Sequence, residues 1–453
     1  MLLRRAARVP GWSWAVLAAV LFGLGQLPAA PSKLTPDSAA YLMQTLDLLG
    51  RTPAEARAET ITAFCAGYRA ERVVNLAPSG PVSAGYGARR ESDCVARLTR
   101  EGQADTTNRY GPAITEGTQI PSPRYEAIFL SRPGTAVVFA PLVGMAGPLC
   151  GMWLTVLTCT LAASLLVYLV LRTLGLGRPA AVLGQVLYLV LPTGEWSMYL
   201  LSEAPALVLT VVLLLGVTYV VKERPGLGTG LITAAFLAGM FVKYSQFLLI
   251  AAGLAAMALV AAIVHRRFDR PVLIVGGLAL LWIPLLLAVS ALMNWPGGAE
   301  SIQDLLTGHY AEPDVADPVH QLLRLNVYFW SWWLVQQLTA PLLLVSWAAA
   351  AGILRWTRTP IWWAVTAIFL SALATQAGHP VASQGDRLYV GAWLLVVVAV
   401  PLLADKMTNR PGSPARSADD AAVLPRQRTA TDHRLDGPRT VAGPDQRRSA
   451  PAG

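Results

Sequence analysis

Residues 198–221, MYLLSEAPALVLTVVLLLGVTYVV, decide the fold class of this chain. After Glu203 the run holds no charged residue, and about 20 apolar residues in a helix cross the roughly 30 Å hydrocarbon core of a bilayer. Similar apolar runs lie near residues 12–30, 147–171, 179–193, 227–242, 246–264, 271–293, 338–354, 360–376 and 389–404. The sequence therefore predicts an all-α polytopic membrane protein with about ten transmembrane helices.

The composition agrees with a membrane protein. The 453 residues are 54% hydrophobic and only 14% charged, whereas about 25% of the residues of a soluble domain are charged. The net charge of +9 is compatible with nucleic-acid binding, but the basic residues lie at the ends of apolar runs and in the C-terminal tail. These positions suit anionic lipid headgroups, so we expect membrane lipids, and no nucleic acid, as partners.

The charges between the apolar runs predict an orientation. With a cytoplasmic N-terminus, the inside connections are short and basic, as the positive-inside rule requires; they are residues 172–178, 222–224, 265–270, 355–358 and 406 onward. The outside connections then carry acidic residues, namely Glu195, Asp304, Glu312, Asp314, Asp317 and Asp386. We therefore expect a multi-pass protein of the cytoplasmic membrane with both termini in the cytoplasm.

The chain divides into a transmembrane domain, residues 1–404, and a tail, residues 405–453. The tail is rich in Pro, Arg, Asp, Ser and Ala and has too few bulky apolar residues to form a core, so we expect it to be disordered. Two extracytoplasmic loops are expected, at residues 31–132 and 294–333. Leu322–Trp333 in the second loop is rich in aromatic residues and is interpreted as an interfacial helix.

The first loop follows an apolar run that is either a retained helix, the interpretation we favour, or a signal peptide; either way the loop is exported. Thr35 and Pro36 predict the start of a helix from Asp37 to Leu49, because Thr caps helices and Pro suits the first turn.

The four cysteines form no metal-binding pattern. Cys150 and Cys159 fall in an apolar run, where a thiol behaves as a small hydrophobic group. Cys65 and Cys94 share the first loop, where an extracytoplasmic location permits a disulfide. We expect these two residues to lie close together.

Five stretches, in consistent order over residues 1–404, together resemble the membrane-embedded GT-C glycosyltransferases, the superfamily of lipid-A aminoarabinose transferases and protein O-mannosyltransferases. They are LTPDSAAY (34–41), SRPGTAVVFAPL (131–142), YLLSEAPA (199–206), GMFVKYS (239–245) and GDRLY (385–389). Two departures are evident: Arg132 replaces the first proline of the family's Pro-Pro-Gly-Tyr-Pro stretch, and one residue is inserted in the family's final Arg-Tyr pair.

The resemblance implies an enzyme that moves a sugar from a polyprenyl-phosphate donor to an extracytoplasmic lipid or glycan of the cell envelope. Such a reaction needs a base for the acceptor's proton and cations for the departing phosphate. Asp37 is the candidate catalytic base, although an acid in the first turn of a helix is also favoured by the helix dipole alone. No second acid lies beside it, so we expect no metal, and we expect no cofactor.

Lys243 and Arg387 are the candidates for holding the phosphate, and Arg132 and Arg124 are weaker ones. The alternative is snorkelling, in which a long cationic side chain at a helix end reaches the headgroups. Lys243 and Arg387 lie on the expected outer side, against the charge bias that sets the orientation, and this position favours a functional role.

Other candidates belong to the same motifs. Glu203, near the start of an apolar run, needs a cationic partner such as Lys243 or Arg387, and its role is either structural or sugar-binding. Tyr41 and Tyr389 are implied by the resemblance to bind substrate. His309 and His379 lie in outer loops and are expected to be solvated.

Two rival functions remain open. A transporter or flippase of a lipid-linked sugar usually has ionisable groups near the membrane midplane and repeated halves. The apolar runs here carry no charges in their middles and no repeat is evident, so the sequence favours the enzyme. A non-catalytic scaffold with the same fold is the other alternative.

Overall fold

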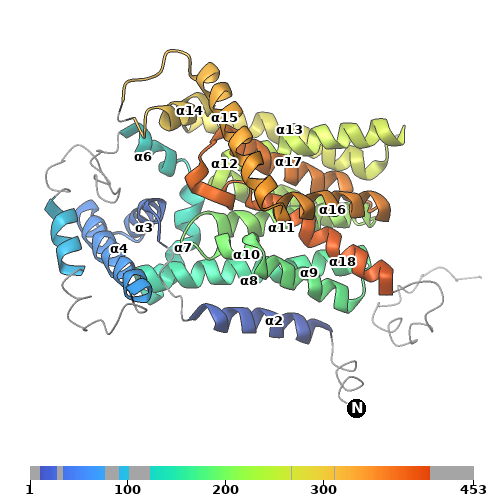
Figure 1. The fold of residues 1–453 in the computed structure, drawn as a ribbon, viewed down its shortest axis with the longest axis horizontal. Helices are drawn as coiled ribbons and strands as arrows, with labels where there is room; N and C mark the ends of the chain where they lie inside the picture. The colour runs from blue at the N-terminus through green and yellow to red at the C-terminus, as the bar shows by residue number, and fades with distance from the viewer. Residues whose placement is uncertain are drawn as a thin grey trace, which may run out of the picture. The chain divides into compact units, whose positions relative to one another are not determined.

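The computed structural model describes residues 11–27, 34–76, 91–100, 123–266, 268–310 and 312–408 (Figure 1). All regular structure in these ranges is helical. The first half contains α2 (Gly11–Gln26), α3 (Pro36–Leu48), α4 (Pro53–Leu76), a helix over 91–100, α6 (Pro123–Leu130), α7 (Pro133–Ala146), α8 (Pro148–Leu174), α9 (Arg178–Val190), α10 (Pro192–Ser197) and α11 (Glu203–Val221). The second half contains α12 (Pro225–His265), α13 (Arg270–Leu292), α14 (Gly298–Leu306), α15 (Pro318–Thr339), α16 (Leu342–Thr357), α17 (Trp362–Gly378), η3 (Ala382–Arg387), η4 (Val390–Trp393) and α18 (Leu394–Thr408).

The described residues contain five helices that are long and apolar enough to cross a membrane: α8, α11, α12, α13 and the segment Val390–Thr408. Two further pairs, α6 with α7 and α15 with α16, pass the same test together but bend by 69° and 90°, so the count reaches seven if each pair is one span. The chain is therefore an all-α, multi-pass membrane protein. Ten spans stay a prediction, because α2 and α9 are apolar but short and the runs predicted at 227–242 and 246–264 together form the one helix α12.

Most helices begin and end near the predicted positions, with two corrections. The predicted run from residue 198 becomes helical only at Glu203, because the short helix α10 and a turn occupy the preceding residues. The predicted interfacial helix Leu322–Trp333 is part of the longer α15. This helix starts at Pro318, where the Asp317 side chain accepts a hydrogen bond from the His320 backbone N–H. The predicted tail lies outside the described residues beyond Thr408.

Helix α12 is broken at Lys243, whose backbone is extended at φ −161° and ψ 70°. The break agrees with the two separate apolar runs of the sequence. The start of α7 fits against it: the Thr135 hydroxyl donates a hydrogen bond to the Val242 carbonyl at 3.2 Å. A Cβ atom on Gly134 would lie 2.8 Å from the Phe241 backbone, so only glycine allows this close approach.

The membrane helices share one large apolar core. Helix α11 packs between α8 and α12, and α12 also packs against α13 and α17 (Figure 1). A second cluster, which includes Tyr41, Phe129 and Phe139, joins α3 and α6 to α7. This second cluster fixes the first-loop helices onto one end of the bundle, at the left of Figure 1.

The opposite end gathers segments that the sequence predicted to share one side of the membrane. The Gly177 backbone N–H donates a hydrogen bond to Asp405 at 2.7 Å, and Gly11, at the start of α2, lies against Arg178. These contacts agree with the predicted topology, in which the N-terminus, residues 172–178 and the residues after the last helix lie on the same side of the membrane. The face of the membrane to which this end belongs stays a prediction.

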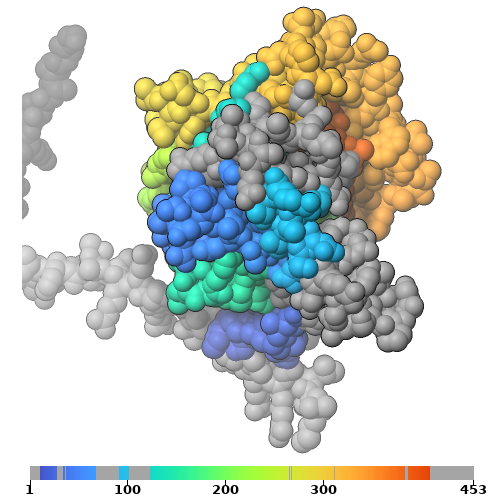
Figure 2. Space-filling model, turned by 90° about the vertical axis from the view of Figure 1, so that its left-hand side faces the viewer, coloured from blue at the N-terminus to red at the C-terminus, as the bar shows by residue number. Residues whose placement is uncertain are grey.

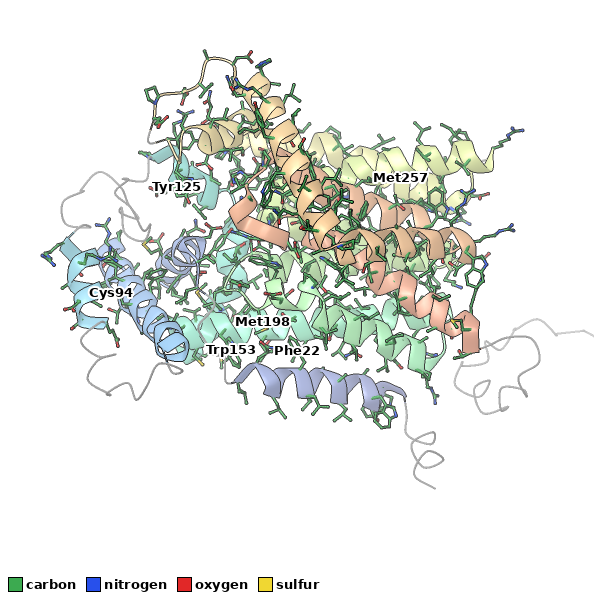
Figure 3. All side chains as sticks on the ribbon, in the orientation of Figure 1. Phe22, Cys94, Tyr125, Trp153, Met198 and Met257 are labelled. Carbon is green, nitrogen blue, oxygen red and sulfur yellow. A yellow bond between two sulfur atoms is a disulfide. The ribbon has the colours of Figure 1, made fainter. Side chains whose placement is uncertain are left out.

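The first-loop helices are joined by a disulfide between Cys65 on α4 and Cys94 on the helix over 91–100, with a Cα–Cα distance of 5.8 Å. Beside the disulfide, Ile61 and Leu98 form a small buried apolar cluster. The two helices lie side by side in Figure 2, and Cys94 is labelled in Figure 3. The prediction that the two cysteines lie close together is confirmed.

Candidate functional site

Three candidate residues from distant parts of the chain form one chain of ion pairs. The Arg387 Nη2 atom donates to Asp37 Oδ2 at 2.6 Å, and its Nε atom donates to Glu203 Oε1 at 2.7 Å. Burial alone would lower the pKa of Arg387, but the carboxylates of Glu203 and Asp37 raise it above the ordinary value. Arg387 therefore stays protonated and bridges the two acids.

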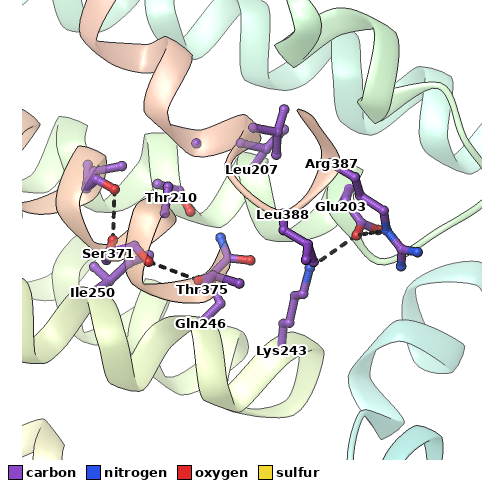
Figure 4. A pocket seen from close by; sticks show the side chains of 14 residues that line it. Glu203, Leu207, Thr210, Lys243, Gln246, Ile250, Ser371, Thr375, Arg387 and Leu388 are labelled. Atoms are coloured by element: carbon purple, nitrogen blue, oxygen red, sulfur yellow. Dashed lines mark hydrogen bonds and ion pairs between the residues drawn. The ribbon is translucent and has the colours of Figure 1, made fainter. Parts of the chain in front are cut away.

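Lys243 completes a buried triad with Glu203 and Arg387. Its Nζ atom donates to the same Glu203 Oε1 atom at 3.2 Å (Figure 4). Glu203 Oε2, in contrast, is buried with no hydrogen-bond partner among the described residues. Glu203 Oε1 thus accepts hydrogen bonds from both cations, while Oε2 accepts none from the described residues. The prediction that Glu203 pairs with Lys243 or Arg387 is confirmed, since it pairs with both.

Arg132 and Tyr41 lie next to this network. Arg132 Nη1 donates to the Tyr41 hydroxyl at 2.8 Å, and this hydroxyl donates to Ser202 Oγ at 3.2 Å. Among the described residues Arg132 makes no ion pair. The three cations Arg132, Lys243 and Arg387, set against the carboxylates of Asp37 and Glu203, leave the network with a net charge of +1.

Each of the paired side chains is positioned by a helix end or a break. Asp37 lies in the first turn of α3, which is started by a reciprocal hydrogen-bonded cap between Thr35 and Ser38. Glu203 opens α11, Lys243 lies at the break of α12, and Arg387 ends η3. Helix ends expose backbone groups and allow sharp changes of direction, so charged side chains from separate helices meet here at the same level of the bundle.

Tyr389 is oriented differently from the other candidates. Its hydroxyl donates to Asp386 and accepts from Trp333 Nε1 at 3.4 Å. Its ring packs edge-on against Trp333 and Trp347. The structure therefore places Tyr389 in a buried aromatic cluster rather than in the ion-pair network.

A second group of charged residues joins the two loops. Arg124 on α6 pairs with Glu300 at 2.7 Å and with Asp314 at 2.8 Å, and its guanidinium lies 4.3 Å from the ring centre of Tyr310. The residue therefore connects the two loops, and its role as a weaker phosphate ligand stays a prediction.

The structure also reveals an Asp–His pair that the sequence analysis missed. His309 Nδ1 lies 2.9 Å from Asp304 Oδ1. Asp304 lies on α14, and His309 lies in the turn after this helix, where Gly308, His309 and Tyr310 all have positive φ. The bond to Asp304 raises the pKa of His309 despite partial burial. The His309 side chain is half-exposed, as expected of a loop histidine, but it is also paired with an acid. The only sequence signal was an acid and a histidine on either side of a glycine.

His379 also departs from the expectation. It is partly buried at the end of α17, and burial lowers its pKa, against the raising effect of the Asp304 and Asp37 carboxylates. Both histidines therefore feel the charge of Asp37. The acidic turn of the second loop and the ion-pair network belong to one electrostatic environment.

A small cavity opens beside the buried triad and is lined at one end by Glu203, Lys243 and Arg387 (Figure 4). The expectation that Asp37, Lys243 and Arg387 converge on one cavity, with Glu203 near its wall, is correct for the two cations and wrong for Asp37. Asp37 does not line this cavity and is joined to it only through Arg387. Within the described ranges no three His, Cys, Asp or Glu side chains are grouped closely enough to hold a metal ion.

No protein-family model matches the chain, and no significant similarity to a curated protein or a solved structure was found. The geometry of the site therefore carries the functional argument.

Proposed function

We propose that the chain is a membrane glycosyltransferase of the GT-C type, which moves a sugar from a polyprenyl-phosphate donor to a lipid or glycan outside the cytoplasmic membrane. The observation that carries the proposal is the net charge of +1 on a largely buried network that includes Arg132, a cation without an ion-pair partner. Arg132 itself is half-buried, and an excess cation that is partly removed from water is more stable when an anion compensates it. A phosphate at a membrane interface is the anion that the proposed donor supplies.

The proposed chemistry uses the network in two steps. The donor phosphate first takes hydrogen bonds from Arg132 and Arg387, because a guanidinium matches phosphate oxygens with parallel donors. Arg387 is then shared with the phosphate, and its hold on Asp37 weakens. Asp37 in turn accepts the proton of the acceptor hydroxyl.

The bond changes balance. The acceptor oxygen bonds to the anomeric carbon as its proton passes to Asp37, and the bond between that carbon and the phosphate oxygen breaks. The electron pair leaves with the polyprenyl phosphate, whose added negative charge Arg132, Lys243 and Arg387 stabilise. The proposal includes ten spans, cytoplasmic termini and a site at the outer interface.

A transporter or flippase of a lipid-linked sugar is the second candidate. The specific observation in its favour is the broken helix α12, with the charged Lys243 at the break, since transporters use interrupted helices to bind substrates. Purified protein in vesicles separates the two functions. An enzyme releases polyprenyl phosphate only when an acceptor is present, whereas a flippase moves intact donor between leaflets without cleaving it.

The test in cells compares envelope glycans and accumulated lipid-linked sugars with and without the gene. Loss of one glycan together with build-up of one lipid-linked sugar supports the proposal. Unchanged envelope glycans and lipid-linked sugars would count against it.

The test in vitro measures binding of the accumulated donor to Arg132→Gln. We expect at least about a tenfold loss of affinity, because a charge-assisted hydrogen bond is worth roughly 1.5–3 kcal/mol. Arg51→Gln is the matched control, since Arg51 forms an exposed ion pair with Glu59 in the same loop. Equal binding by both variants would refute the role of Arg132.

A further inference from the structure

The cavity beside the buried triad is a polar recess inside an otherwise apolar bundle. Beyond its charged end, it is lined by the polar side chains of Thr210, Gln246, Ser371 and Thr375 (Figure 4). The space open to the centre of a water molecule is about 10 Å³, which is room for one water-sized group. We refer to this cavity as the recess.

The hydroxyl groups of the recess offer hydrogen-bond acceptors. Thr210 donates its hydroxyl proton to the Ala206 carbonyl at 2.8 Å, and Thr375 donates to the Ser371 carbonyl at 2.9 Å. Ser371 likewise donates to Ile368 at 2.8 Å. Since each hydroxyl has only one proton, its oxygen is left to accept a hydrogen bond from whatever enters the recess.

Two further polar groups of the recess have no partner. Glu203 Oε2 is buried without a hydrogen bond, and the Gln246 amide makes no hydrogen bond to any described residue. Buried polar groups are nearly always satisfied, and leaving one unpaired is costly. Of the two groups only Glu203 Oε2 is fully buried, while Gln246 is half-buried. The recess therefore favours a guest that donates a hydrogen bond to an acceptor oxygen and can accept one from the Gln246 amide.

The charges around the recess select the type of guest. Lys243 and Arg387 already share Glu203, so an additional ammonium group would meet two cations at the same end. An ionised carboxylate or phosphate has no proton to donate to the acceptor oxygens of the recess, and it would repel the carboxylate of Glu203. A neutral hydroxyl fits both the charge and the size, and the aliphatic side chains of Leu207 and Ile250 in the wall suit an attached methylene.

We infer that the recess binds the hydroxymethyl group of the donor sugar and thereby selects a hexopyranose over a pentopyranose. The inference rests on the proposed function, in which Arg132 and Arg387 hold the donor phosphate and Lys243 helps to stabilise its charge. In a pyranose the anomeric carbon and the carbon that bears the hydroxymethyl group both flank the ring oxygen. A sugar whose phosphate meets the cations therefore presents its hydroxymethyl group to the same edge, where the recess begins.

The experiment measures donor binding to the purified full-length protein in lipid nanodiscs. The two probes are polyprenyl-phosphate-linked glucose and polyprenyl-phosphate-linked xylose, which differ only in the hydroxymethyl group. We expect glucose to bind about tenfold to a hundredfold more tightly, because a site built around a hydroxyl rejects the analogue that lacks it. In Thr210→Val and in Gln246→Leu this ratio falls towards one.

The matched control is Thr218→Val on the same helix α11. Thr218 is buried and donates to its own helix at 2.8 Å as Thr210 does, but it does not line the recess, so the ratio stays at the wild-type value. Equal affinity of the wild type for both donors, or an unchanged ratio in Thr210→Val and Gln246→Leu, overturns the subsite and leaves the proposed function standing. Binding of neither donor overturns both.

Discussion

Two groups of three charged side chains form ion pairs in this protein, one with a single acid between two cations and the other with a single cation between two acids. They differ in how far their side chains are buried. In the bundle, Glu203 accepts from Lys243 and Arg387, with exposed side-chain fractions of 1%, 10% and 11%. Between the loops, Arg124 donates to Glu300 and Asp314, with exposed fractions of 41%, 42% and 49%. The contact distances are similar, so burial is what separates them.

This difference indicates which triad can act on a substrate. Exposed ion pairs are screened by water and salt and contribute little. Buried charges interact strongly, and an arriving anion changes the balance of the whole network. The loop triad therefore joins α6 to the second loop, whereas the bundle triad is the one that, in the proposed function, acts on the donor phosphate.

The largest expected effect concerns Asp37, which joins the bundle triad through Arg387. Asp37→Asn should lower turnover by about 10²–10⁴-fold, the usual contribution of general acid–base catalysis. The helix should persist, because Asn is tolerated at a helix start. The measurement is release of polyprenyl phosphate, with donor binding followed separately. Asp47→Asn on the same helix is the control, and equal turnover in both variants would exclude Asp37 as the base.

A smaller but substantial effect is expected on stability from Glu203→Ala. Removal of the carboxylate leaves the buried Lys243 without an ion-pair partner and leaves Arg387 with Asp37 alone, and breaking a buried pair in this way costs roughly 3–5 kcal/mol. The free energy of unfolding in detergent micelles provides the measurement. A loss that stays the same from low to high salt would support burial as the cause, and a loss below about 1 kcal/mol would contradict the argument.

Arg124→Ala tests the other half of the comparison. It should lower the free energy of unfolding by only about 1 kcal/mol or less, since exposed pairs contribute little. The remaining effect should shrink further near 1 M salt, where the screening length falls to about 3 Å. If Arg124→Ala destabilised the protein as much as Glu203→Ala, burial would not be the property that distinguishes the triads.

The smallest expected effect is the pH dependence of the folding stability that arises from His309. Its pKa in the folded protein is raised above 6.5 by Asp304, so the folded state binds the proton more tightly than the unfolded state. The resulting stabilisation is fully present below pH 6.5 and is lost as the pH rises through the raised pKa.

The measurement compares the pH dependence of thermal unfolding in the wild type and in His309→Asn, in which Asn suits the positive φ. The difference between the two should shrink with rising pH. His379, with its lowered pKa, contributes the opposite slope. Because His309 helps to lower that pKa, both proteins are also compared with His379→Asn added. A difference that stayed constant with pH would refute the role of the Asp304–His309 pair.

The sequence alone determined the helices of the membrane domain. Apolar runs such as 203–221 and 271–292 form helices because only a helix satisfies its own backbone in lipid. The break at Lys243 was visible as a charge between two apolar runs, and the start of α3 as the Thr35–Pro36 pair. These features could be predicted because each depends on residues close together in the sequence, namely the length of an apolar run or the residues at a helix start.

Only the tertiary structure decided which charges pair. Arg124 and Arg387 look alike in the sequence, as arginines near acids in polar segments. The fold gives Arg124 exposed partners between the loops, and it joins Arg387 to Asp37, 350 residues away, with Arg132 left free of acids. The free energy of an ion pair depends on its burial and on the positions of all neighbouring charges. Both are set by helix packing across the whole chain, which no short stretch of sequence encodes.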